Sequence, residues 1–164
     1  MDQNKLKLTS SEIGSLWAEY VNGTMTDVVN RYMVSIIEDE EIKSHFFEDA
    51  IKTFEKKQKK QMVTFIENEG FPVPIGFTES DLNKGAEKKL FTDIFCLNYL
   101  HIMTLHGLLG HSTALAVSVR KDLRYFFTTL VITTGKRMYH QTIELLLKKG
   151  NFQRDPLFLS CQEP

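Results

Sequence analysis

The sequence predicts an all-α protein, a single four-helix bundle over residues 1–164 with a long Pro/Gly-containing crossover between its second and third helices. Apolar residues recur at helical spacing along four long stretches, which is the pattern of helices that each bury one face. Prolines and glycines, which cannot continue a helix, lie together between the second and third stretches. The length of 164 residues is that of one domain.

The first helix is predicted over about 10–37 and the second over about 40–69. Thr9, with Glu12 three residues later, forms the pattern of a capping box that opens the first helix. An acidic cluster at 38–41 suits the electropositive start of the second. The apolar residues that give the helical spacing are Ile13, Leu16, Trp17, Tyr20, Val28, Val29, Tyr32, Met33, Ile36 and Ile37, and then Phe46, Phe47, Ala50, Ile51, Phe54, Met62, Phe65 and Ile66.

A strap is predicted over 70–88, because its prolines and glycines exclude both a helix and a central strand. About 19 extended residues reach up to about 60 Å, whereas a helix of about 28 residues is roughly 42 Å long. The strap can therefore cross the whole bundle and leave the second and third helices parallel, as in ferritin-like folds. Within the strap, Thr78 with Asp81 predicts a short helical turn.

The third helix is predicted over about 89–117 and the fourth over about 119–149, with Ser118 as the cap between them. Gly150 is the stop signal, and residues 150–164 form a tail. The third helix is apolar in every direction, so it needs more cover than a simple bundle gives. That cover is either the strap and tail of its own chain or a second chain.

Small residues on the third helix fall on one side of it and form a ridge that allows close backbone approach. Two interpretations stay open: tight packing within the monomer, or the seam of a homodimer. The candidate interface residues are Gly107, Leu108, Gly110 and Ala114.

Charge and composition restrict the partners. The 20 basic and 21 acidic side chains nearly cancel, which argues against nucleic acid. Residues 94–119 contain no Asp, Glu, Lys or Arg and are long enough for a membrane span, but they contain three histidines, so no span is predicted. Two distant cysteines, Cys96 and Cys161, and a polar N-terminus without a secretory signal indicate the cytoplasm.

The bundle raises the question of a di-iron centre, which needs Glu-x-x-His pairs on two helices. No Glu or Asp of this chain has a His three residues later. We therefore predict no catalytic, cofactor-binding or metal-binding residues, no enzymatic activity and an interior filled by side chains. His101 and His140 are weak candidates for a metal, since they fall at similar heights in adjacent helices. His45 is expected on an exposed face with Glu41 and Glu48.

Four segments resemble a known family. They are LTSSEIGSLW at 8–17, GFPVPIGFT at 70–78 with DLN at 81–83, SVRKDLR at 118–124 and KGNF at 149–152. Together they are similar to an uncharacterised ferritin-like four-helix family of spore-forming bacteria, a domain of unknown function, some of whose members are described as spore coat proteins. Many members carry two such domains in tandem, so the resemblance implies that a second copy of this chain can dock as a homodimer.

Two functions remain open. The first is a structural or interaction protein of the spore coat or of sporulation, located in the cytoplasm or the spore coat, with other coat or sporulation proteins as partners. The second is a metal- or small-ligand-binding bundle related to di-iron proteins but lacking their Glu-x-x-His ligands. The resemblance supports the first, and the histidines of the third and fourth helices support the second.

Overall fold

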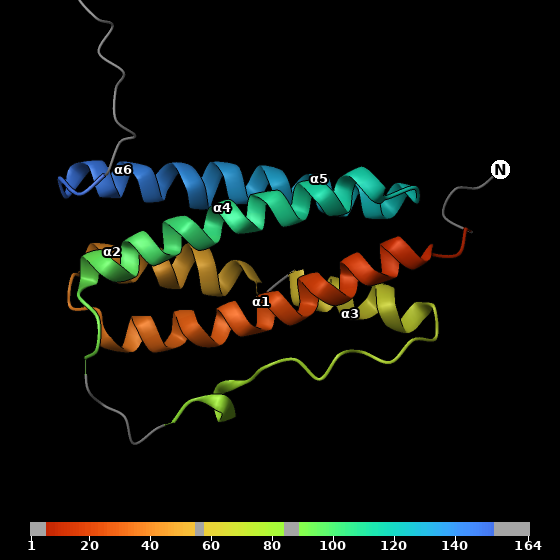
Figure 1. Ribbon diagram of the computed structural model, residues 1–164, viewed down its shortest axis with the longest axis horizontal. Coiled ribbons are helices and arrows are strands. Elements are labelled where there is room, and N and C mark those ends of the chain that lie inside the picture. Colours follow the sequence, from red (N-terminus) through yellow and green to blue (C-terminus); the bar gives the residue numbers. More distant parts are fainter. Residues whose placement is uncertain (1–5, 55–57, 84–88, 153–164) are drawn as a thin grey trace, which may run out of the picture.

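A computed structural model describes residues 6–54, 58–83 and 89–152, and within these ranges the regular elements are all helices (Figure 1). They form four rods that lie side by side along the long axis of the molecule. The rods are α1 (Ser10–Ile36); α2 (Glu40–His45) with the π-helix η2 (Phe46–Ile51) and α3 (Lys59–Asn68); α4 (Asp93–Val117); and α5 (Lys121–Thr133) with the π-helix η5 (Thr134–Tyr139) and α6 (His140–Lys148).

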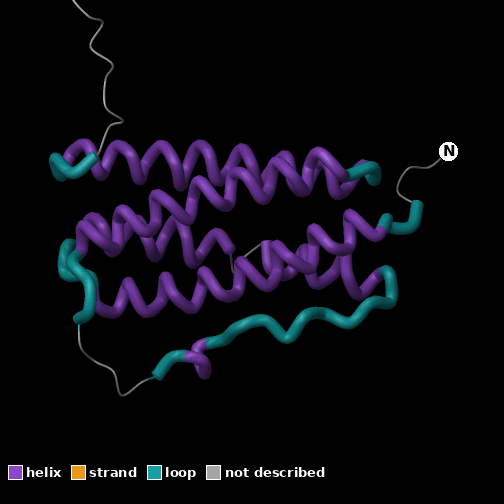
Figure 2. The backbone as a smooth tube through the Cα atoms, viewed as in Figure 1, coloured by secondary structure: helices purple, strands orange, loops and turns teal. Residues whose placement is uncertain are grey.

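The second and third rods run in the same direction, as the length of the crossover predicts. Figure 2 shows the strap returning along the outside of the bundle before α4 begins. The strap packs on α1, where the Phe77 N–H donates to Thr24 Oγ1 at 3.1 Å. Gly76 has a φ of +67°, and an added Cβ would lie 2.9 Å from atoms of both Tyr20 and Thr24. Glycine is therefore required where the strap meets α1.

The predicted helix starts are correct where a side chain caps them. Thr9 Oγ1 accepts from the Glu12 N–H at 3.2 Å and Glu12 Oε2 accepts from the Thr9 N–H at 2.8 Å, so the capping box is confirmed. The short turn is also confirmed, as the 3-10 helix η4 (Glu79–Asp81) with a capping box from Thr78 to Asp81.

Two predicted boundaries of the last two helices are wrong. The third helix begins at Asp93, where Thr92 Oγ1 accepts from the Phe95 N–H, and not at 89. Ser118 does not cap the fourth helix, because its hydroxyl donates back to the Ala114 carbonyl at 2.7 Å. It ends α4, and α5 begins after Arg120.

The side chain of Glu12, which is distant in sequence, accepts the backbone N–H groups at the start of the fourth rod instead. Its Oε1 accepts from the N–H groups of Val119 and Arg120, both at 2.8 Å, while only 1% of the residue is exposed. Burial alone would raise the pKa of Glu12, but the backbone N–H groups of Arg120, Thr9 and Val119 outweigh it and lower the pKa. One carboxylate thus joins the start of α1 to the turn between α4 and α5.

The predicted fourth helix, about 119–149, is a rod that stays helical from Lys121 to Lys148, and the described parts of the predicted second helix, about 40–69, are also helical. The π-helical turns within these rods were not predicted. Both rods contain a π-helical segment, η2 in the second and η5 in the fourth. A π-turn takes one more residue than an α-turn, so it shifts which side chains face the core. Contacts join η2 to η5 across the bundle.

The apolar core is divided into two clusters. One comprises buried residues of α1, α3, α4 and α5, and the other comprises residues of α1, α2, η2, α4 and α6. The first cluster contains Leu8, Leu16, Tyr20, Met62, Ile66, Ala114, Leu123, Phe126, Phe127 and Leu130. The second cluster contains Met33, Ile37, Ile42, Phe46, Cys96, Leu97, Leu100, Leu145 and Leu146.

None of the described helices has both the length and the hydropathy of a membrane span.

Candidate functional site

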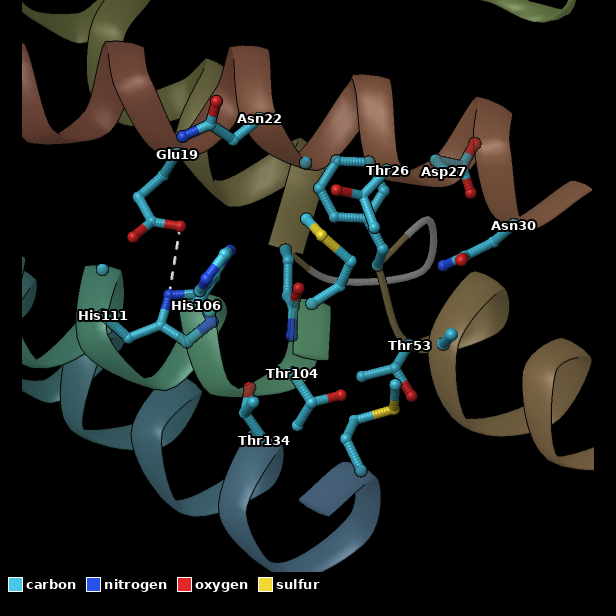
Figure 3. Close-up of a pocket in the computed structure, with 18 of the residues that line it drawn as sticks. Glu19, Asn22, Thr26, Asp27, Asn30, Thr53, Thr104, His106, His111 and Thr134 are labelled. Atoms are coloured by element: carbon cyan, nitrogen blue, oxygen red, sulfur yellow. Dashed lines mark ion pairs between the residues drawn. The ribbon is translucent and has the colours of Figure 1, made fainter. Parts of the chain in front are cut away.

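A cavity of about 360 Å³ lies in the middle of the bundle (Figure 3). All four rods contribute to its lining, and many of the lining side chains are polar. Among these polar side chains are Glu19 and Asn30 from α1, Asp49 from η2, Thr104 and His111 from α4, and Thr134 from η5. The expectation of an interior filled by side chains is therefore wrong in the middle of the bundle.

Small residues and the π-helical segments account for the open space. Gly107 and Gly110 lie on the lining, and a Cβ added at Gly107 would lie 3.7 Å from His111 Nε2 and 3.9 Å from Thr134 Cγ2. These are ordinary contact distances, so glycine leaves room there that a side chain would fill. The π-helical turns of η2 and η5 place further residues of the second and fourth rods on the same lining. Such turns are frequent at functional sites.

A contact between a carboxylate and an imidazole marks one end of the cavity. Glu19 Oε2 lies 3.0 Å from His111 Nδ1, with both side chains largely buried. The pair joins α1 to α4, as the dashed line in Figure 3 indicates. The angle at Nδ1 does not fit a hydrogen bond, so this nitrogen still lacks one among the described residues. Both groups therefore retain hydrogen-bonding capacity toward the cavity.

Asn30 lies on the same lining, eleven residues further along α1. It is only 4% exposed, and its Oδ1 is buried without a hydrogen bond from any described residue. Thr104, in contrast, satisfies its hydroxyl by donating to the Leu100 carbonyl at 2.8 Å. A buried acceptor oxygen without a donor costs about 1–3 kcal/mol, so Asn30 is a polar group placed at the expense of stability.

His45 is buried beside the cavity, so its expected exposed position with Glu41 and Glu48 is wrong. Its Nδ1 lies 3.0 Å from Asp49 Oδ2 and its Nε2 lies 2.8 Å from Thr142 Oγ1. Thr142 donates its own proton to the Met138 carbonyl, so its oxygen accepts from Nε2–H. His45 thus links Asp49 of η2 to Thr142 of α6 through its two ring nitrogens.

The two weak metal candidates lie on either side of one tyrosine. His101 stacks on Tyr139 at 5.7 Å between ring centroids and contacts Phe152 at 6.0 Å, while the His140 ring lies 6.0 Å from that of Tyr139. Burial lowers the pKa of His101, which favours its neutral form. Within the described residues, no group of three or more His, Cys, Asp or Glu side chains could hold a metal ion.

The four candidate interface residues lie toward the inside of their own bundle. Gly107 and Gly110 line the cavity, Ala114 belongs to the first apolar cluster, and Leu108 Cδ2 would be 3.9 Å from a Cβ at Gly135. The exposed apolar residues of α4 are different ones. Phe95, Ile102 and Leu109 are 48%, 49% and 68% exposed and lie seven residues apart, and we call them the α4 stripe.

Several residues of the site were not predicted, namely Glu19, Asn30 and Asp49. One signal in the sequence points to them. Thr24 and Asn30 interrupt the buried face of α1, and Thr104 interrupts the buried face of α4. Polar residues at buried helical positions on two helices indicate a polar layer between apolar ones.

Comparisons with known proteins agree on an uncharacterised group. The profile of a family described as "Protein of unknown function (DUF3231)" matches residues 1–163. The crystal structure of a putative spore coat protein from Bacillus halodurans C-125 is similar, with a TM-score of 0.84 and 19% sequence identity, over 96% of this chain and 99% of that one. At this identity the likeness shows a common fold. No curated protein matches this chain.

Proposed function

The chain belongs to the DUF3231 family of proteins of unknown function, and for this member we propose a structural or interaction role in the spore coat or in sporulation, without catalytic activity. We further propose a ferritin-like four-helix bundle as its fold family, because one long crossover joins parallel second and third rods. The likeness to the Bacillus halodurans protein supports the coat assignment. The proposed location is the cytoplasm or the spore coat.

The observation on which the interaction role depends is the α4 stripe. Phe95, Ile102 and Leu109 are large apolar side chains that the described part of the chain leaves exposed. The strap, which was one of the two expected covers, packs on α1 instead. A repeat of seven residues along a helix is the spacing at which a second helix packs.

We propose that a second copy of the chain covers the α4 stripe. Residues 94–119 carry no Asp, Glu, Lys or Arg, so two copies of this face can meet without like-charge repulsion. An uncharged helix face offers no charge complementarity to a different partner, whereas an isologous dimer needs only self-complementary shape. The candidate residues Gly107, Gly110 and Ala114 then serve the packing within each bundle, and the stripe forms the seam.

Size-exclusion chromatography with light scattering tests this dimer. The protein should elute with about twice the 19.0 kDa of one chain. Leu109→Glu should give a folded monomer, because Leu109 is 68% exposed and its replacement leaves the interior unchanged. Ile75→Glu is the matched control, since Ile75 is 98% exposed on the strap and should leave the dimer intact. A monomeric parent protein, or a dimeric Leu109→Glu, would contradict the proposal.

The central cavity favours a second function, the binding of a small ligand. Its volume of about 360 Å³ lies within the range of sites for small molecules. Its lining combines apolar walls with a few convergent polar groups, which is the usual composition of such sites. Isothermal titration calorimetry with small amphiphiles tests it, and a variant with a filled cavity should not bind them.

A further inference from the structure

The chemistry of the cavity lining narrows the class of ligand. Three carboxylates, those of Glu19, Asp27 and Asp49, lie on the lining, and no Lys or Arg is found among its described residues. An anionic ligand would therefore lose its hydration without gaining a cationic partner from these described residues. A neutral or cationic molecule meets no such penalty.

The three carboxylates differ in their partners. Asp27 is 2.9 Å from Arg31 Nε, and Asp49 faces both His45 and Arg137. Glu19 faces His111 alone among the described residues, at 3.0 Å and in a geometry that forms no hydrogen bond. Glu19 is thus the lining carboxylate with the greatest remaining capacity to accept a charged donor.

The second unmet group is also an acceptor. Asn30 Oδ1 is buried and lacks a donor among the described residues, and its side chain lies on the lining. Glu19 and Asn30 are eleven residues apart on α1, or about 16 Å along the helix. The lining therefore carries an available acceptor at Glu19, and a second acceptor without a donor lies buried at Asn30.

We infer that the central cavity binds a small organic amine as its cation, with the ammonium group at the Glu19–His111 end and an apolar body between the rods. An ammonium group supplies three donors and no acceptor, so it can donate to the Glu19 carboxylate at this end of the cavity. The Phe54 ring and the thioether of Met103 line the walls, and both are favourable neighbours of a cation with an apolar body. This inference rests on the second proposed function and does not depend on the dimer.

The cavity is also accessible to such a molecule. His106 and Gly110 on α4 and Asn22 and Met25 on α1 are exposed residues of the same lining. They place the entrance between α1 and α4, next to the Glu19–His111 pair shown in Figure 3. A ligand can therefore reach Glu19 without separation of the two apolar clusters.

Isothermal titration calorimetry of the full chain with three probes of matched shape tests the inference. The probes are 2-phenylethylamine, 2-phenylethanol and phenylacetate. The amine should bind most tightly and phenylacetate should not bind. Glu19→Gln should weaken amine binding by about tenfold and leave the alcohol unchanged, because it removes only the charge.

Two glycine variants locate the site. Gly107→Leu should abolish binding of the amine, because its side chain occupies the cavity from a position with ordinary contact distances. Gly14→Leu makes the same change in α1 where no atom lies within 4 Å of the added Cβ, so it should bind as the parent does. If Gly107→Leu does not fold, Glu19→Gln alone decides.

The possible results distinguish the amine assignment from small-ligand binding in general. Equal binding of the three probes, or preference for phenylacetate, would overturn the amine assignment and leave small-ligand binding in place. No change of amine affinity in Glu19→Gln would overturn the placement of the ammonium group. Failure of every probe to bind the parent protein would overturn both the inference and the second proposed function.

Discussion

Replacement of Glu12 should be among the most destabilising single changes in a side chain of this protein. Its carboxylate accepts three backbone N–H groups, those of Thr9, Val119 and Arg120, each at 2.8 Å. In Glu12→Ala, loss of the capping box costs about 1 kcal/mol, and each of the two long-range N–H groups left without an acceptor costs about 1–1.5 kcal/mol. The free energy of unfolding should therefore fall by roughly 3–4 kcal/mol.

Urea denaturation followed by circular dichroism measures this loss at pH 7. Glu12→Gln is the informative companion, because its amide oxygen can still accept from Val119 and Arg120 while its NH₂ group faces the Thr9 N–H. It should cost about 1–3 kcal/mol, less than alanine. A loss below about 1 kcal/mol in Glu12→Ala would refute the assignment of these three hydrogen bonds as a structural link.

The contribution of Glu12 to the free energy of unfolding depends on pH. The pKa of Glu12 is lower in the folded protein than its ordinary value of 4.5. Its stabilising contribution is therefore complete above about pH 4.5 and is lost as the pH falls through the lowered folded pKa. The difference in unfolding free energy between the parent and Glu12→Gln should stay constant above about pH 5 and shrink from about pH 4.5 down to about pH 3. A constant difference over this range would show that the carboxylate charge contributes nothing.

Thr142→Val should lower the free energy of unfolding by about 1–3 kcal/mol in thermal denaturation, because it leaves the buried His45 Nε2–H without an acceptor. Thr113→Val is its control at an exposed threonine of α4, and equal effects of the two variants would argue against the buried hydrogen bond. Burial raises the pKa of the Cys96 thiol, so in a Cys161→Ala background iodoacetamide at pH 8 should label native protein far more slowly than protein unfolded in urea. Equal labelling rates would show that Cys96 is accessible.

Features set by neighbouring residues could be predicted from the sequence. The capping box of Thr9 and Glu12 and the turn at Thr78 depend on side chains three residues apart, which periodicity reveals. The strap was predicted from its prolines and glycines, and its length predicted the direction of α4. The absence of charge in residues 94–119 predicted a helix without a polar face, and Phe95, Ile102 and Leu109 of α4 are exposed. What covers them stays a prediction.

Features set by distant residues could not be predicted. Ser118 is a good cap in isolation, but Glu12 from another rod already holds the N–H groups that a cap would satisfy. The π-helical segments shift the buried face by a residue, and this shift is invisible in an apolar pattern that both geometries satisfy. The cavity depends on where Gly107 meets the other rods, and helical spacing alone does not give that meeting point.

The division of the apolar core has a consequence for how the molecule opens. Each cluster ties together segments from all four rods at its own end, and the central cavity lies between the two clusters. Local opening of the bundle then requires the least free energy at mid-length, where it leaves the packing of both apolar clusters intact. A ligand of the central cavity can therefore enter and leave by local opening, on a timescale far shorter than that of global unfolding.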